Sequence, residues 1–330
     1  MHLSSAARRL ALGLFIAVPS TSLGAQRSER VARIGYLAPQ SPETWGLSVF
    51  RQGLRDLGWA EGRNLIIDYR SADGKFERLP ALAAELAALD VQIIVAVATV
   101  PALAAKRATQ SIPIVFTHVS DPVGSGLVPR LARPGGNVTG FTHFNAGLAP
   151  KRLELLKQVV PGARQVAALW HPGGLGEHTE KEMISETEEA ARALGVPVQI
   201  LAVRGMHELE AAFAALRGDN AKPVIVLPSP MFRNQPKVLV DLAAKYRLPA
   251  IYFDREFAEA GGLMAYGADM ADVVRGAASY VDRILRGAKP GDLPVVRATR
   301  FELFINLKTA ENLGLSVPER LAIQADKVIR

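Results

Sequence analysis

Short apolar runs recur along the chain and alternate with segments in which apolar residues return every three or four positions. The runs are rich in β-branched residues and start about 15–35 residues apart, the length of a strand, its helix and a right-handed crossover. They form two sets, at 32–38, 64–70, 91–97, 112–119 and 137–144, and at 165–171, 196–203, 223–229, 249–254 and 262–267. The alternation predicts a mostly parallel sheet in each half of the chain.

The segments between the runs predict amphipathic helices. In the segment 47–59, four apolar side chains share one helical face: Val49, Phe50, Leu54 and Leu57. The segments 50–70 and 188–203 echo each other, since each reads as a helix, a Leu-Gly stop and a strand. We therefore predict an α/β protein with two Rossmann-like, doubly wound lobes, each a sheet covered by helices on both faces.

The two lobes are not expected to be consecutive in the chain. After the tenth apolar run, a predicted helix at 272–287 is followed by an extended, proline-containing segment and a last helix. The prediction places residues 30–142 and 268–297 in lobe 1, and residues 143–267 and 298–330 in lobe 2. The chain then crosses between the lobes three times, which favours rigid lobes that rotate about a hinge.

The N-terminus has the pattern of a secretory signal peptide over residues 1–25. Arg8 and Arg9 precede an apolar run and then small residues, so cleavage is expected after Gly24 or Ala25. The run is too short to span about 30 Å of hydrocarbon, and no later segment is long and apolar enough. The chain has no cysteine, which excludes a lipid-modified lipoprotein and disulfides. We expect a periplasmic protein without stable membrane insertion.

Composition narrows the function further. With 330 residues the chain is long enough for two domains. Its formal charge of +7 falls to about +5 without Arg8 and Arg9, and the basic residues are scattered rather than clustered on one face. A nucleic-acid partner is therefore not expected.

Patterns typical of catalysis and cofactor binding are absent from the sequence. The run GSGLVP lacks the third glycine of a dinucleotide loop, and no Gly-Lys-Ser/Thr loop follows a strand. Ser125 has Val123 where a nucleophile elbow needs glycine. The histidines lack the spacing of metal ligands: His118, His143, His171, His178 and His207. We predict no catalytic residue, no cofactor and no metal site.

Polar and aromatic side chains do gather where an α/β sheet binds its ligand, at the carboxyl ends of the strands. The candidate ligand-binding residues are Ser41, Trp45, Thr99, Val100, His118, Ser120, Asp121, Trp170, His171, Ser229, Asp254, Glu256, Tyr266 and Asp269. Thr99 precedes Pro101 at a helix start, where it caps the helix or helps to hold a carboxylate. Asp121 either caps the turn after its strand or faces the cleft.

Longer segments resemble the bacterial ABC-transporter substrate-binding protein family that includes tryptophan- and tyrosine-binding members. The resemblance covers about residues 30–330 and is carried by 50–70, 78–86, 112–116, 121–128, 131–141, 151–172, 256–267 and 280–315. It implies the type I periplasmic binding protein fold, with a solute trapped by lobe closure and delivered to an inner-membrane permease that has a separate ATPase. The sequence departs from the family where Thr99-Val100-Pro101 replaces Thr-Pro, and where 297–300 reads RATR instead of Gln-Pro-Thr-Lys.

The leading hypothesis is a solute-binding protein for a small amino-acid-like or aromatic compound. Thr99 and nearby backbone N–H groups would hold a carboxylate. The acids that could balance an amino group of the solute are Asp121, Asp254 and Glu256. The aromatic residues that could cover its apolar part are Trp45, Trp170 and Tyr266. Two alternatives stay open: an exported sugar-nucleotide enzyme on a related scaffold, and a ligand-sensing module for a membrane receptor. A LacI-type repressor is excluded, because a signal peptide occupies the place of its DNA-binding helices.

Overall fold

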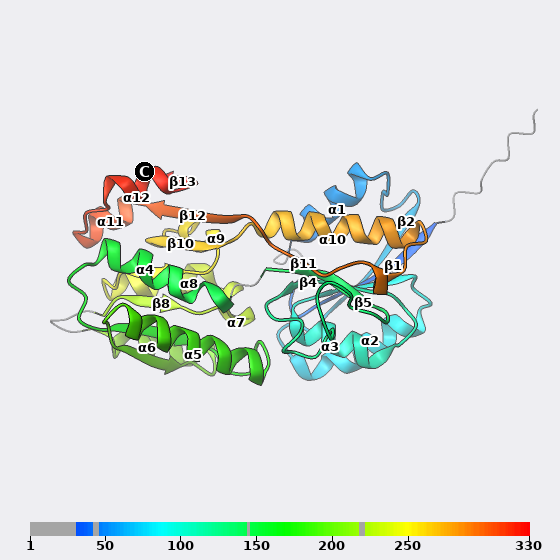
Figure 1. Cartoon of the computed structure of the whole chain (residues 1–330), viewed down its shortest axis with the longest axis horizontal. Helices are drawn as coiled ribbons and strands as arrows, with labels where there is room; N and C mark the ends of the chain where they lie inside the picture. Colours follow the sequence, from blue (N-terminus) through cyan, green and yellow to red (C-terminus); the bar gives the residue numbers. More distant parts are fainter. Residues whose placement is uncertain (1–30, 42–45, 144–145, 218–221) are drawn as a thin grey trace, which may run out of the picture. The chain divides into compact units, whose positions relative to one another are not determined.

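The computed structural model describes residues 31–41, 46–143, 146–217 and 222–330. The predicted signal peptide and Trp45 lie outside these described residues. Residues Val31–Arg330 form one compact unit, in which two sheets are each covered by helices (Figure 1). Within the described residues, no helix has the length and apolar character needed to cross a membrane.

Sheet 1 has six strands in the order β11-β5-β4-β3-β1-β2, and every neighbouring pair is parallel. Its strands are β1 (Ala32–Ala38), β2 (Leu65–Ser71), β3 (Ile93–Val97), β4 (Ile114–Val119), β5 (Val138–Thr142) and β11 (Val296–Arg297). Helices α1 (Leu47–Asp56) and α10 (Met270–Leu285) pack on one face, and α2 (Leu79–Ala88) and α3 (Thr99–Ala108) pack on the other. Sheet 1 and these helices are called lobe 1 below.

Sheet 2 has seven strands in the order β13-β12-β10-β9-β8-β6-β7. They are β6 (Val166–Trp170), β7 (Val198–Ala202), β8 (Val224–Val226), β9 (Ala250–Tyr252), β10 (Met264–Ala268), β12 (Phe301–Asn306) and β13 (Lys327–Ile329). All pairs are parallel except β10 with β12. Sheet 2 and its helices are called lobe 2.

Helices cover both faces of sheet 2 (Figure 1). Helices α4 (Ala149–Val159), α5 (Glu177–Ala193), α11 (Leu307–Leu313) and α12 (Glu319–Gln324) share one apolar cluster. Helices α6 (Leu209–Ala214), α7 (Pro230–Arg233), α8 (Pro236–Lys245) and α9 (Arg255–Glu259) share the other. Short 3₁₀ turns lie at Phe76–Arg78, Ala146–Leu148, Met206–Glu208 and Pro290–Asp292.

The expected fold class is confirmed, and each of the ten apolar runs contains a strand. Runs buried on both faces form central strands because helices cover both sides; every residue of β3 and β4 is buried. The chain passes from sheet 1 to sheet 2 after β5, returns to lobe 1 with α10, and passes to sheet 2 again between β11 and β12. The residue boundaries of the lobes given above stay a prediction.

Candidate functional site

A pocket lies where the carboxyl ends of central strands from both sheets approach one another. Its lining residues are Ala98, His118, Ser120 and His143 from lobe 1, and Leu175, Pro228, Ser229, Pro230, Arg233 and Phe253 from lobe 2. The side chains of the two lobes approach one another closely around this space. We call it the interlobe pocket.

The lobe 1 wall of the interlobe pocket has an unusual backbone. Ala98 directly follows β3 with φ 73° and ψ 168°, and His118 lies near the end of β4 with φ 56°. Residues with a Cβ seldom adopt positive φ, and each such position costs about 1–3 kcal/mol. Strain of this kind persists where the surrounding structure holds it and is typical of ligand-binding sites.

Two hydroxyl groups in the same wall have no hydrogen-bond partner. Within the part of the chain that the structure describes, neither Thr99 Oγ1 nor Ser120 Oγ makes a hydrogen bond, although both residues are at most 1% exposed. A buried polar group left unpaired costs about 1–3 kcal/mol. Ser120 lines the pocket, and Thr99 begins α3, whose N-cap position Ala98 carries no capping side chain. Thr99 therefore does not act as the helix cap, and its hydroxyl is free to bind a ligand.

The lobe 2 wall of the interlobe pocket holds two sets of paired polar side chains. Ser229 Oγ accepts a hydrogen bond from the backbone N–H of Met231 at 3.1 Å and lies 3.1 Å from Nδ1 of His171. Arg233 forms an ion pair with Asp254, and both side chains are almost fully buried. Asp254 also caps α9 through the N–H of Glu256. Each charge in this wall is thus balanced or hydrogen-bonded.

Buried charges of both signs lie around the pocket, with Arg152 and Arg233 positive and Asp254 and Glu180 negative. Burial, with Arg233 and Arg152 nearby, lowers the pKa of His143 to about 3. Burial, then Arg233 and His143, lowers the pKa of His118 well below its usual value. Arg152 on α4 is fully buried and donates from Nε to the carbonyl oxygen of Tyr266 at 2.8 Å. Burial lowers its pKa to about 9. At neutral pH the histidines are therefore neutral and Arg152 is charged.

Three of the residues predicted from sequence line the pocket: His118, Ser120 and Ser229. Thr99, His171 and Asp254 lie next to lining residues through the chain or through the contacts given above. Trp170 and Tyr266 are half-buried and pack against the lobe 2 core, where the Tyr266 ring is 6.3 Å from that of Phe301. Their proposed contact with a ligand stays a prediction.

The remaining predicted residues do not line the pocket. Asp121 Oδ1 accepts hydrogen bonds from the N–H groups of Val123 and Gly124, at 3.1 and 2.8 Å, so this side chain caps its turn. Asp269 caps α10, and its carboxylate lies 3.8 Å from the guanidinium of Arg300. This contact joins the segment between β10 and α10 to the segment between β11 and β12, and both segments connect the lobes. The other residues of this group, whose ligand contacts likewise stay predictions, are Ser41 and Glu256, both exposed, and Val100, which is half-buried in α3.

Sequence reasoning missed three residues that the fold places at or beside the pocket: His143, Arg152 and Arg233. Arg233 lies four residues after the predicted Ser229, but an arginine near a strand end gives no sign of burial. Arg152 lies on an amphipathic helix, where arginine is usually exposed. The one signal in the sequence is that Arg152 occupies a position where the helical repeat of apolar residues would place a buried side chain.

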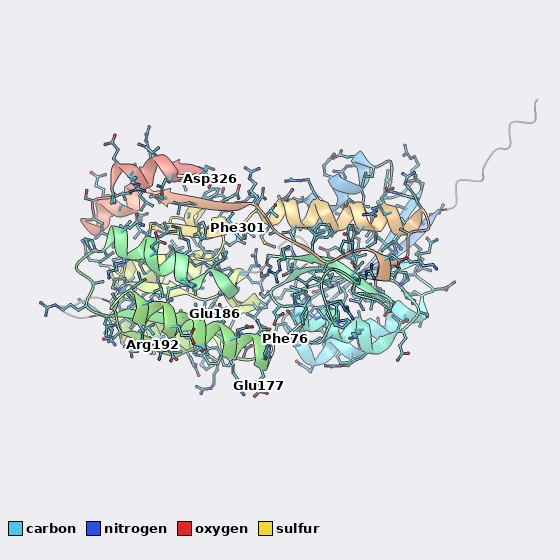
Figure 2. All side chains as sticks on the ribbon, viewed as in Figure 1. Phe76, Glu177, Glu186, Arg192, Phe301 and Asp326 are labelled. Atoms are coloured by element: carbon cyan, nitrogen blue, oxygen red, sulfur yellow. The ribbon has the colours of Figure 1, made fainter. Side chains whose placement is uncertain are left out.

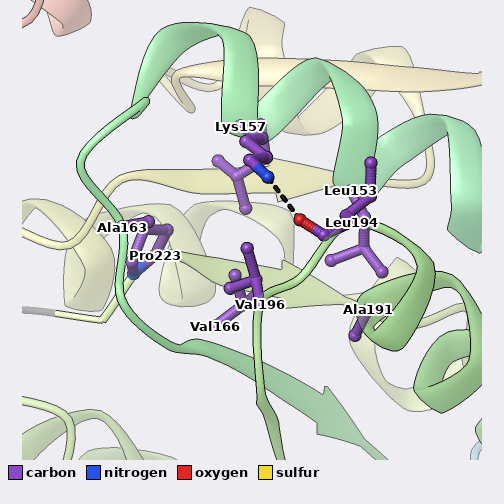
Figure 3. A pocket seen from close by; sticks show the side chains of 9 residues that line it. Leu153, Lys157, Ala163, Val166, Ala191, Leu194, Val196 and Pro223 are labelled. Carbon is purple, nitrogen blue, oxygen red and sulfur yellow. Dashed lines mark hydrogen bonds between the residues drawn. The ribbon is translucent and has the colours of Figure 1, made fainter.

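A second, narrow pocket lies in lobe 2, between α4, α5 and the strands beneath them (Figure 3). Its lining is almost entirely apolar and includes Leu153, Val166 and Val196. The one charged lining side chain, Lys157, donates a hydrogen bond to the carbonyl oxygen of Leu194. This cavity offers no group for a polar solute, so the interlobe pocket remains the better candidate site.

Known proteins resemble this chain over most of its length. Residues 46–329 match the family model for the ABC transporter substrate binding protein. The chain belongs to this family. A tyrosine-binding protein of Clostridioides difficile (strain R20291) is 27% identical over 266 residues, covering 81% of this chain and 75% of the relative.

Solved structures extend the similarity to the whole fold. A conserved domain protein from Vibrio cholerae O1 biovar El Tor matches 91% of this chain and all of its own, with 27% identity and a TM-score of 0.82. An ABC domain from Streptococcus pneumonia, solved in complex with L-Trp, matches 90% of this chain and 99% of its own, with 26% identity and a TM-score of 0.81. The type I periplasmic binding protein fold and the solute-binding role expected from the sequence are both confirmed.

Proposed function

We propose that this solute-binding protein captures an aromatic amino acid or a closely related compound in the interlobe pocket and delivers it to a membrane permease with a separate ATPase. The observation that carries the proposal is the pairing of unsatisfied buried hydroxyls in lobe 1 with a buried arginine–aspartate pair in lobe 2. Two relatives, one named for tyrosine and one solved with L-Trp, support the choice of compound.

The two walls suit the two charged groups of an amino acid. The Thr99 and Ser120 hydroxyls and the N-terminal N–H groups of α3 would bind the carboxylate, which also favours the positive end of a helix dipole. In lobe 2, Asp254 is a candidate partner for the amino group, because Arg233 keeps its carboxylate in place at the pocket. Phe253 adds an apolar lining surface, and its ring is already covered by the Arg233 guanidinium at 5.7 Å.

Lobe closure would exclude water from these contacts and so strengthen them. The predicted signal peptide places the mature protein in the periplasm, where the closed form would dock on the permease. A purified permease complex in vesicles tests this part: transport of the solute should require both the binding protein and the ATPase. Binding of the closed form to a sensor kinase instead would favour the sensing alternative.

Direct calorimetry tests the ligand class. The mature chain is unfolded, dialysed and refolded to remove any solute carried from the host, and is then titrated with L-Trp, L-Tyr and L-Phe. Matched compounds lacking one charged group, tryptamine and indole-3-propionate, are the controls. We expect binding of at least one aromatic amino acid and a loss of at least about tenfold for each control, since each leaves a buried polar group unpaired.

Two outcomes would overturn the proposal. Equal affinity for tryptamine and L-Trp would mean that the hydroxyls of lobe 1 do not hold a carboxylate. Turnover of a nucleotide-sugar, with no binding of amino acids, would replace the proposal by the enzyme alternative. Mass spectrometry of the bound compound after incubation separates capture from chemical conversion.

A further inference from the structure

Three side chains that can bind a metal ion converge beside the interlobe pocket. Asp121 follows β4 in lobe 1, while His178 and Glu182 lie on α5 in lobe 2, and one donor atom from each falls within 4.8 Å of the others. His178 Nε2 lies 3.9 Å from Asp121 Oδ2 and 3.9 Å from Glu182 Oε2. Both separations exceed hydrogen-bond distance, so the imidazole nitrogen lies between two carboxylates without bonding to either.

The Asp121 carboxylate is already oriented for a ligand. Its Oδ1 accepts the N–H groups of Val123 and Gly124, and its Oδ2 faces His178. Outer hydrogen bonds that fix one oxygen of a carboxylate and leave the other free are typical of the support that metal ligands receive. The local cap and a ligand role are therefore compatible in this residue.

Gly124 makes room for the approach of the two lobes at this point. A Cβ at this position would overlap the Asp121 carboxylate and would lie 2.6 Å from Nε2 of His178. Any other residue would push the imidazole away from the turn. A glycine here is thus required for the three donors to meet.

The surroundings favour a cation over a competing side chain. In the part of the chain that the structure describes, no lysine or arginine forms an ion pair with Asp121 or Glu182. Glu186 lies one turn further along α5 than Glu182. Figure 2 shows Glu177 at the start of α5 and Glu186 farther along the same helix. The first two turns of α5 thus carry Glu177, Glu180 and Glu182 and one lysine, Lys181, which pairs with Glu177.

We propose that Asp121, His178 and Glu182 form a site for a divalent transition metal of the Zn²⁺ class, which bridges the two lobes at the edge of the interlobe pocket. One imidazole and two carboxylates are ligands that Zn²⁺ accepts, with a fourth position left for water. Tetrahedral Zn²⁺ places its ligand atoms about 3.4 Å apart. Side-chain rotations that move each donor atom by about 1 Å would therefore complete the site.

The metal would act as a clamp. His178 and Glu182 share one face of α5, spaced by four residues, while Asp121 belongs to the other lobe. A bound ion therefore adds a bond between lobes that a solute alone does not supply, and it slows opening. The site itself does not rest on the proposed solute, because none of its three residues lines the interlobe pocket.

The test is a titration of the refolded, chelator-treated mature chain with Zn²⁺, followed by competition with a chromophoric chelator. We expect one ion per chain and a loss of affinity of at least about tenfold in each of H178A, E182Q and D121N. Asn at position 121 retains a side-chain oxygen for the turn, so D121N keeps the local fold. H207A is the matched control, because His207 is also exposed but faces a single carboxylate, Glu208 at 4.0 Å; it should leave the affinity unchanged.

Hydrogen exchange distinguishes a metal ion bound by both lobes from one bound by α5 alone. With Zn²⁺ bound, amide exchange in the turn 121–126 should slow in the natural protein and stay unchanged in H178A. Unchanged Zn²⁺ affinity in D121N would show a site on α5 alone and overturn the clamp. A dissociation constant above about 100 µM, or equal loss in H207A, would overturn the metal site itself. Either result leaves the amino-acid titrations, and so the proposed solute, untouched.

Discussion

The two walls of the interlobe pocket are built in opposite ways. In lobe 1, two residues with positive φ, Ala98 and His118, stand beside two buried hydroxyls that have no partner among the described residues. In lobe 2, Arg233 and Asp254 pair with each other, and Ser229 is bonded to a helix start. The lobe 1 wall thus carries strain and unsatisfied hydroxyls, whereas the polar side chains named in the lobe 2 wall are paired.

The difference suggests that the two walls contribute to solute binding in different ways. A wall whose polar groups satisfy one another keeps its shape and presents fixed charges, at little cost when a solute arrives. A wall with unpaired hydroxyls gains most from a solute that bonds to them, because the binding removes an existing penalty. On this view lobe 2 orients the solute and lobe 1 supplies the larger gain on closure.

The largest effect is expected from breaking the buried pair in lobe 2. Arg233→Ala should lower the free energy of unfolding by about 3–5 kcal/mol, because it leaves the Asp254 carboxylate buried and uncompensated. Urea denaturation measures the change. The double variant R233M/D254L should recover most of the loss, and K237A, which breaks an exposed pair with Asp241, should cost at most about 1 kcal/mol. A small loss in R233A would contradict the view that the lobe 2 wall depends on this pair.

Acidification should weaken the fold through the buried histidines of lobe 1. The folded protein holds His143 neutral with a pKa of about 3, while in the unfolded chain the value is ordinary. The unfolded state therefore binds more protons below about pH 6.5, and stability is lost as pH falls from there toward 3. By pH 5 the loss reaches about 2 kcal/mol from His143, with a further contribution from His118, whose pKa is also lowered.

Denaturation at a series of pH values tests this expectation. The variant H143Q keeps a hydrogen-bonding side chain of similar size. Between about pH 6.5 and 3, its free energy of unfolding should depend less steeply on pH, by the slope that corresponds to about one bound proton. Charges facing these histidines are Arg152 and Arg233. An unchanged slope in H143Q would mean that other groups cause the acid sensitivity.

The unpaired hydroxyls provide the sharpest test of the comparison. Thr99→Val should leave the ligand-free protein as stable or up to about 1 kcal/mol more stable, and should weaken solute binding by at least about tenfold. The matched control is Thr139→Val, since the buried Thr139 hydroxyl donates to the carbonyl oxygen of Leu293 at 2.7 Å. That variant should lose about 1 kcal/mol of stability with unchanged affinity. The reverse pattern would assign Thr99 a structural role only.

The smallest expected effect concerns the backbone strain beside the pocket. Ala98→Gly relieves a φ of 73° and should stabilise the ligand-free protein by about 1 kcal/mol, after the greater entropy of glycine in the unfolded chain is counted. Thermal unfolding measures it. Gly at Ala102, inside α3, is the control and should destabilise. Destabilisation by A98G would show that Ala98 is not strained.

Much of the fold could be predicted from periodicity. The ten apolar runs contain the ten main parallel strands, because buried β-branched runs between amphipathic helices have few other folded arrangements. Strands β11 and β12 lie in the predicted extended segment after the helix at 272–287, whereas the short strand β13, which follows a polar stretch, was not predicted. Its pairing depends on the sheet edge to which it adds, which local sequence does not encode.

The site was predicted only in part, for a similar reason. His118, Ser120 and Ser229 were found because strand ends in parallel sheets are the expected place for a ligand. Arg152 and Arg233 were missed, because burial of an arginine depends on what packs over it. Likewise, His178 showed no metal-ligand spacing in the chain, and only the approach of two lobes brings Asp121 beside it.

The sequence by itself thus determined the class of the molecule: two α/β lobes, an expected export signal, and candidate polar residues at strand ends. These features follow from local patterns of burial and from turn residues. Tertiary structure alone decided which polar groups are paired, which are strained, and which residues from distant segments meet. Electrostatics and hydrogen bonding depend on distances in space, so a chain read in one dimension does not contain them.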